Sequence, residues 1–282
     1  MDQKKIYILV GAFCLFAVIA AIFAEVSTHK KENNINNVSF NEGEIVDNNE
    51  TTEKSQEEIK GDLNSYFTNK LTVNNYDTSK IKKINNDKDI VYSAYDIKDK
   101  TDNYDVDIHL PVINIQGVVP MEFNDITQSV FADKATEILT NKQQQNNIYT
   151  VNYSAYINNN VLSLIIKSTL KSGSDTQRTV IQTYNYNLET GEKLKIEDVL
   201  SIKNIIQSEC RNKIKTTIER AKQEAEILIQ AGYTVYNRDT TSQMYLLSNV
   251  NTFFVGKNSN LYIIFPYGNQ NFTSEMDIVL YE

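Results

Sequence analysis

Few side chains in this sequence have the types and spacings that metal or acid–base chemistry requires. The two histidines, His29 and His109, are far apart, and a zinc site would need further ligands at suitable spacing. One acidic cluster could offer oxygen ligands to Ca²⁺, and its members are Asp99, Asp102, Asp105 and Asp107. The cluster lacks the glycine and the terminal glutamate of an EF-hand loop. We therefore expect a solvated acidic turn, with no metal and no cofactor.

Nucleophilic catalysis has no better support in the sequence. Ser172-Gly173-Ser174 does not match a nucleophile elbow, and no third catalytic partner can be named. Cys14 lies inside an apolar run, and Cys210 has the spacing of a buried thiol on a helix face. Paired carboxylates for glycoside cleavage are not singled out by any pattern among the 36 acidic residues. We predict no catalytic residue and expect that the protein is not an enzyme.

Tyrosine is the remaining residue type that could bind a ligand, and the chain has 17 tyrosines. Several alternate along predicted strands, where their rings could stack on sugars or anchor a protein partner. The alternative is that they fill half-buried strand positions, which tyrosine favours for packing alone. We take Tyr184, Tyr186 and Tyr267 as the ligand-binding candidates and keep the packing interpretation open.

Composition excludes some classes of function. The chain has 282 residues, with 28 Lys+Arg against 36 Asp+Glu and a net charge of −8. A nucleic-acid binder would need a basic surface to displace phosphate counterions, so nucleic acid is not an expected partner. The 41% hydrophobic and 23% charged residues are typical of a globular chain with one or two domains.

The elements that would position these side chains begin with an uncharged apolar run at residues 6–24. At about 1.5 Å per residue, a helix of this length crosses the hydrocarbon core of a bilayer. We predict a transmembrane signal-anchor there, after a cytoplasmic tail at residues 1–5. Lys4 and Lys5 favour a cytoplasmic location for the short N-terminal tail. We therefore predict a single-pass protein of the plasma membrane with an extracellular C-terminal body. Ala24 would neighbour a signal-peptidase cut, but Ile22 is not the small residue preferred there, so the uncut anchor is favoured.

Residues 25–60 are rich in Asn, Glu, Lys, Ser and Thr and have few large apolar side chains, so they predict a disordered stalk. Beyond it, period-2 alternation predicts strands at 89–97, 104–115, 148–157, 161–170, 178–188, 252–255, 261–265 and 276–281. Helical spacing predicts amphipathic helices at 121–142 and 202–231. Without regular β-α-β alternation, this order indicates an α+β fold with a mostly antiparallel sheet packed with two main helices. We divide the body into a smaller α+β subdomain at 61–146 and a C-terminal domain at 147–282.

One family resemblance rests on the order of motifs in the C-terminal half. A strand and turn, residues 184–194, lead into Ile196-Glu197-Asp198-Val199-Leu200 and the long helix. Asn251-Thr252-Phe253-Phe254 and the run from Leu261 to Tyr267 follow. This order resembles the C-terminal domain shared by RsiV-type anti-sigma factors, in their extracellular part, and by PdaC-type peptidoglycan deacetylases. The resemblance covers roughly residues 85–282, without a sigma-binding segment and without a deacetylase domain.

The resemblance implies a membrane-anchored extracellular binding or sensing module of the cell envelope. Its implied ligand is lysozyme or another basic wall-acting protein, or the peptidoglycan glycan itself, besides the lipid bilayer around the anchor. The acidic balance of the chain has the sign that would steer a basic partner toward it. Two alternatives stay open: a peptidoglycan-modifying enzyme or accessory subunit, and a signalling component cleaved near the membrane.

Overall fold

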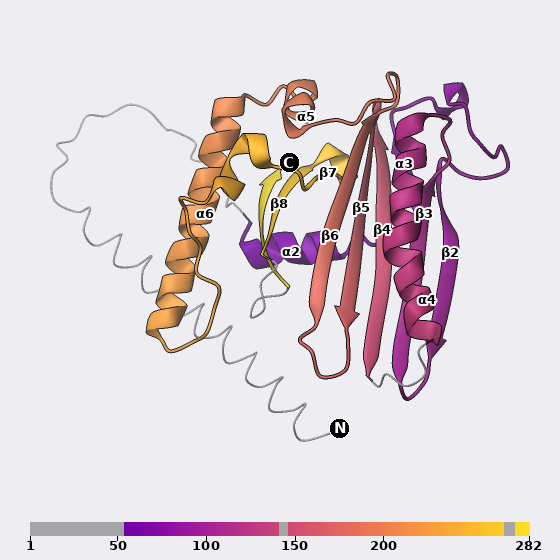
Figure 1. Ribbon diagram of the computed structural model, residues 1–282. Coiled ribbons are helices and arrows are strands. Elements are labelled where there is room, and N and C mark those ends of the chain that lie inside the picture. Colours follow the sequence, from indigo (N-terminus) through magenta and orange to yellow (C-terminus); the bar gives the residue numbers. More distant parts are fainter. Residues whose placement is uncertain (1–53, 141–145, 268–273) are drawn as a thin grey trace. The chain divides into compact units, whose positions relative to one another are not determined.

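A computed structural model describes residues 54–140, 146–267 and 274–282, and Glu53–Glu282 form one compact unit. The predicted cytoplasmic tail, membrane segment and Ala24, and most of the predicted stalk, lie outside the described residues. The unit is an α+β fold with two sheets and helices on their faces (Figure 1). Within the described ranges, no helix has the length and apolar character that crossing a bilayer requires.

The large sheet has the strand order β2-β3-β4-β5-β6, and β1 pairs separately with β4. Its strands are β1 (Leu71–Asn74), β2 (Val91–Lys100), β3 (Tyr104–Ile113), β4 (Asn147–Asn158), β5 (Val161–Lys171) and β6 (Arg178–Asn187). The pairs β2–β3, β4–β5 and β5–β6 are antiparallel, whereas β1–β4 and β3–β4 are parallel. The sheet is therefore mixed but mostly antiparallel, as expected, and the two parallel pairs are what the sequence did not predict.

Alternation along β4 places its side chains on two buried faces. Tyr149, Tyr153 and Ile157 join one apolar cluster, while Tyr156 joins another on the opposite face. This follows from the two-residue period of a strand. Asn159, with φ 52°, begins the tight return into β5, a left-handed conformation that asparagine tolerates.

One edge of β4 is shared between two strands from different parts of the chain. Its first half, from Asn147 to Val151, pairs with β3, and its last residues, from Ala155 to Asn158, pair with β1. Asn69, with φ 58°, bonds the part of β4 between these two pairings. Its N–H donates to the Tyr153 carbonyl, and its side-chain Oδ1 accepts from the Tyr153 N–H, both at 2.9 Å. The backbone groups of β4 thus stay paired where the two partner strands diverge.

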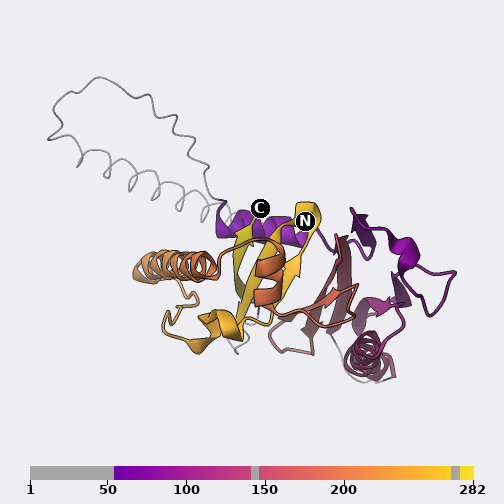
Figure 2. The same cartoon turned by 90° about the horizontal axis from the view of Figure 1, so that it is seen from above.

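Helices α3 (Val118–Thr127) and α4 (Asp133–Thr140), joined by the π-helical turn η2 (Gln128–Ala132), cover one face of the large sheet (Figures 1 and 2). Phe123, Phe131 and Ile138 point into this face, as their helical spacing predicts. Ile126 and Val130, two further apolar residues of the helix expected at 121–142, are about half exposed at 49% and 48%.

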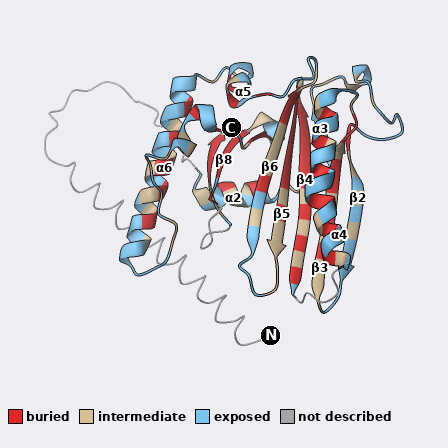
Figure 3. Ribbon diagram, in the orientation of Figure 1, coloured by how far each residue is buried: buried red, intermediate tan, exposed pale blue. Residues whose placement is uncertain are grey.

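The opposite face of the large sheet packs against the small sheet, with strand order β7-β8-β9. Its antiparallel strands are β7 (Phe253–Val255), β8 (Leu261–Tyr267) and β9 (Glu275–Tyr281). The far side of the small sheet is covered by α5 (Ile196–Ile202) and α6 (Gln207–Gln230). The unit is therefore layered as helix, sheet, sheet and helix (Figure 2). Buried residues follow one side of α6 and exposed residues the other (Figure 3).

Three boundaries differ from the sequence predictions. The stalk expected through residue 60 ends earlier, because α2 (Gln56–Asn64) begins there and buries Ile59 and Leu63. The boundary expected at 146/147 does not separate two structural units, since β3 and β4 pair across it. The helix expected from residue 202 begins later, at Gln207 of α6, because Asn204 takes a left-handed conformation, φ 55°, between α5 and α6.

Candidate functional site

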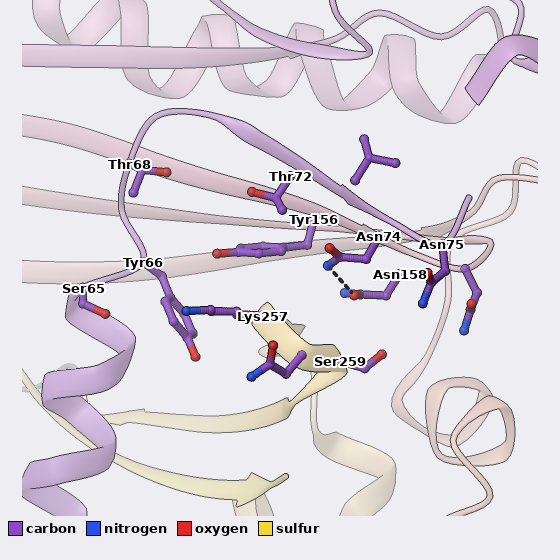
Figure 4. Close-up of a pocket in the computed structure, with 13 residues that line it drawn as sticks. Ser65, Tyr66, Thr68, Thr72, Asn74, Asn75, Tyr156, Asn158, Lys257 and Ser259 are labelled. Atoms are coloured by element: carbon purple, nitrogen blue, oxygen red, sulfur yellow. Dashed lines mark hydrogen bonds between the residues drawn. The ribbon is translucent and has the colours of Figure 1, made fainter. Parts of the chain in front are cut away.

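A polar cleft of about 790 Å³ lies between the end of α2, the edge strand β1 and the turn η5 (Lys257–Ser259) that follows β7 (Figure 4). Its walls come from three parts of the sequence that the fold brings together: residues 65–75, 156–159 and 257–259. The lining consists of five asparagines, four serines and threonines, two tyrosines, one valine and one lysine. The cleft is thus rich in neutral hydrogen-bonding groups.

Helix α2 is fixed at its start, and this positions the first wall. Ser55 and Glu58 form a capping box at its start. The Gln56 side chain donates to the Ile278 carbonyl at 2.8 Å and accepts from the Ile278 N–H at 2.9 Å. An amide side chain thereby completes the free edge of β9 as a neighbouring strand would. The chain leaves α2 through Ser65 and enters the cleft wall at Tyr66.

Two aromatic rings form the inner side of the cleft. The Tyr66 and Tyr156 rings lie 6.1 Å apart between centroids, and Tyr66 also packs edge-on to Tyr262 at 5.6 Å. The Tyr66 and Tyr262 hydroxyls share a hydrogen bond of 2.7 Å. Gly256 permits this packing, since a Cβ there would lie 2.8 Å from the buried Phe254 ring. Tyr66 is half-buried, so it is both a core residue and a surface for a ligand.

A chain of amides crosses the floor of the cleft. The Asn74 side chain donates to Asn158 Oδ1 at 3.0 Å (Figure 4). The buried Asn158 donates in turn to the carbonyls of Val255 and Gly256, at 3.2 and 3.1 Å. These bonds fix β1, β4 and the small sheet relative to one another at the cleft.

The rim is built from residues in the left-handed backbone region. Asn75, Asn159, Asn258 and Ser259 all line the cleft with φ between 52° and 64°. Asparagine tolerates this conformation better than most side chains do, which explains its use at these turns. The exposed side chains of Asn75, Asn159 and Asn258 therefore face solvent from rigid turns and can bond a ligand.

The lining suits binding better than bond cleavage. It holds no carboxylate, imidazole or thiol, the groups that most often act as general acids, bases or nucleophiles. Burial raises the pKa of the Tyr156 hydroxyl. Amides, hydroxyls and aromatic rings recognise a polar, uncharged surface such as a sugar by hydrogen bonds and stacking.

The structure does not bring the three predicted tyrosines together, nor does it place any of them in the cleft. Tyr186 is 5% exposed and Tyr267 is 4% exposed. Tyr184 is half-buried, with its ring edge-on to Phe123 at 4.4 Å between centroids. Tyr186 belongs to the core under α3 and Tyr184 packs against that core, so both rings have the packing role that was left open for them.

Tyr267 instead belongs to a buried polar network at the small sheet. Its hydroxyl donates to Asp277 at 2.7 Å and lies 2.7 Å from the Tyr245 hydroxyl. Arg238 donates to both Asp277 oxygens, at 2.9 and 2.8 Å. Burial is the main cause that raises the pKa of Tyr267, and the negative charge of Asp277 raises it further. Because every member is bonded within the protein, the network ties the loop after α6 to β8 and β9.

The acidic cluster and His109 lie on the β2–β3 hairpin, where Asp99, Asp105 and Asp107 each have a hydrogen-bond or ion-pair partner. Asp107 pairs with Lys98 at 2.7 Å, and Asp105 pairs with Lys100. Asp99 accepts from the Tyr104 hydroxyl at 2.7 Å. His109 Nδ1 lies 2.7 Å from Asp96 Oδ1. In the described part of the chain, no group of three or more His, Cys, Asp or Glu side chains is arranged to hold a metal ion.

Sequence reasoning missed the residues that line the cleft. The one available signal was the pair of Asn-Asn steps, Asn74-Asn75 and Asn158-Asn159, of which only the second stood between predicted strands. Their meeting depends on the parallel β1–β4 pairing, which joins residues 84 positions apart.

Comparisons with known proteins give little further guidance. No protein-family model and no curated protein matches the chain. Among solved structures it is similar to a DUF3298 family protein from Pseudomonas aeruginosa PAO1, with 9% sequence identity and a TM-score of 0.38. That similarity covers 62% of this chain and 80% of the other.

Proposed function

We propose that the protein is a membrane-anchored extracellular binding module of the cell envelope that holds wall glycan in the cleft between β1 and η5. The observation that carries the proposal is the cleft lining of amides, hydroxyls and two tyrosine rings around about 790 Å³. A volume of roughly 300–1,000 Å³ is usual for sites that enclose a small ligand. A short oligosaccharide fits this scale and this chemistry.

The other envelope ligand, a basic protein such as lysozyme, is supported by net charge alone. A net charge of −8 would steer a basic protein toward the chain, and this attraction would weaken with added salt. The cleft, by contrast, is concave and contains only one charged residue, Lys257, whose charge has the wrong sign for a basic partner. We therefore assign the cleft to glycan.

A peptidoglycan-modifying activity at this cleft is disfavoured by the same lining. Hydrolysis of a glycosidic bond commonly uses two carboxylates about 5–10 Å apart, and the cleft lining has none.

Calorimetric titration with soluble wall-glycan fragments tests the proposal. Asn75→Gly, Asn159→Gly and Asn258→Gly each delete a rim amide while keeping the positive φ, because glycine adopts this conformation without strain. We expect each change to weaken binding about 3- to 10-fold, the loss of roughly one hydrogen bond. Asn204→Gly is the matched control, since Asn204 is exposed, has φ 55° and lies outside the cleft.

Two results would contradict the proposal. One is no binding of any wall-glycan fragment at millimolar concentration. The other is binding of lysozyme, weakened by salt and unchanged in the three rim variants, with no glycan binding.

A further inference from the structure

The cleft has a single charged side chain among its lining residues, Lys257. Lys257 is exposed, and within the part of the chain that the structure describes its ammonium group has no ion-pair or hydrogen-bond partner. Figure 4 shows its side chain extending from η5 along the cleft toward Tyr66. A free cation at this place can meet a ligand that lies against the aromatic wall.

The backbone that carries Lys257 is held on several sides. The Gly256 N–H donates to the Asn260 carbonyl at 2.8 Å, and the Asn260 N–H donates to the Lys257 carbonyl at 3.1 Å. Lys203 Nζ donates to the Ser259 carbonyl at 2.5 Å, and Asn158 donates to the Gly256 carbonyl at 3.1 Å. These hydrogen bonds hold the backbone of the turn in place. Only the Lys257 side chain therefore needs to change conformation when a ligand binds.

The nearby charges leave the Lys257 cation unneutralised. No carboxylate lines the cleft, and the acid on the adjoining face of α2, Asp62, is paired with Lys54 at 3.1 Å. The half-buried Lys203 adds a second positive charge beneath the turn. In a chain with a net charge of −8, this cleft is a local positive site that favours an anion.

We infer that the cleft selects a carboxylate-bearing sugar over a neutral sugar of the same length. Lys257 Nζ would donate to the carboxylate, while the rim asparagines and the Tyr66 ring hold the hydroxyl and acetamido groups. Uronic acids and amino sugars with a lactyl ether carry such a carboxylate. This inference rests on the proposed function and adds the class of glycan.

The test compares two disaccharides of N-acetylated amino sugars, one neutral and one with a lactyl carboxylate, by calorimetry on the purified chain. We expect the acidic disaccharide to bind about tenfold more tightly, since a charge-assisted hydrogen bond is about twice as strong as a neutral one. Lys257→Gln should abolish this preference, so that the variant binds the two disaccharides equally, and Lys257→Arg should keep it. Lys215→Gln, which removes an exposed lysine on α6, is the matched control.

The outcomes separate this inference from the proposed function. Equal binding of both disaccharides to the unmodified chain, or an acidic preference that survives in Lys257→Gln, overturns the inference and leaves glycan binding in place. Failure of both disaccharides to bind overturns the proposed function and the inference together.

Discussion

Removal of the Asp277 carboxylate should destabilise the protein more than any change on its surface. Asp277 is fully buried and accepts two hydrogen bonds from Arg238 and one from Tyr267. In Asp277→Ala, the Arg238 side chain, only 10% exposed, would keep its charge without an ion-pair partner. Removing one partner of a buried ion pair costs about 3–5 kcal/mol. That is a large share of a typical unfolding free energy of about 5–15 kcal/mol.

Urea unfolding followed by circular dichroism and tyrosine fluorescence measures this loss, since the chain has no tryptophan. The double variant Arg238→Met/Asp277→Ala should be about as stable as Asp277→Ala alone, because it leaves no unpaired buried charge. We expect a coupling energy of roughly 2 kcal/mol or more. Lys98→Ala, which breaks an exposed pair, should cost less than about 1 kcal/mol. Additive effects of the two network changes would refute the reasoning.

Three further predictions concern single positions. Gly256→Ala should destabilise by about 1–3 kcal/mol, because its Cβ would meet a buried ring, whereas Gly61→Ala, with open space in α2, should stabilise by up to about 1 kcal/mol in thermal unfolding. Burial raises the pKa of Glu224, so its ionisation costs stability as pH rises above the ordinary value of 4.5. Glu224→Gln should therefore raise the melting temperature at pH 7 but not at pH 4, and a gain equal to that of the more exposed Glu219→Gln would contradict this cause. Cys210 is buried with a raised thiol pKa, so mass spectrometry should find it unlabelled by iodoacetamide until urea unfolds the chain.

Local patterns were enough to locate most of the secondary structure. The alternation in β4 and the stripe from Cys210 to Ala225 in α6 are buried as their periods predict. The strand β1 was missed because its apolar and polar residues alternate over only four positions, which is too short to identify a strand reliably. The start of α2 was missed because only Ile59 and Leu63 mark its buried side within a polar sequence.

The site was less predictable than the fold, for a physical reason. Tyr184, Tyr186 and Tyr267 were chosen by residue type, and type alone does not distinguish a ring that packs from a ring that binds. Tyr66, which does face the cleft, stood next to a segment that we expected to be disordered. The cleft requires long-range pairing between β1 and β4, and no local pattern reports such a pairing.

The shared edge of β4 has a consequence for the order in which the protein folds. Strands β4, β5 and β6 are consecutive and antiparallel, so they can form from nearby contacts as soon as they leave the ribosome. β1 is made earlier, but its partner lies 84 residues downstream, and β3 also needs β4 to complete its pairing. We therefore expect the first part of the body to wait for β4 and to acquire its native structure last. Hydrogen-exchange labelling during refolding should protect β4 and β5 before β1.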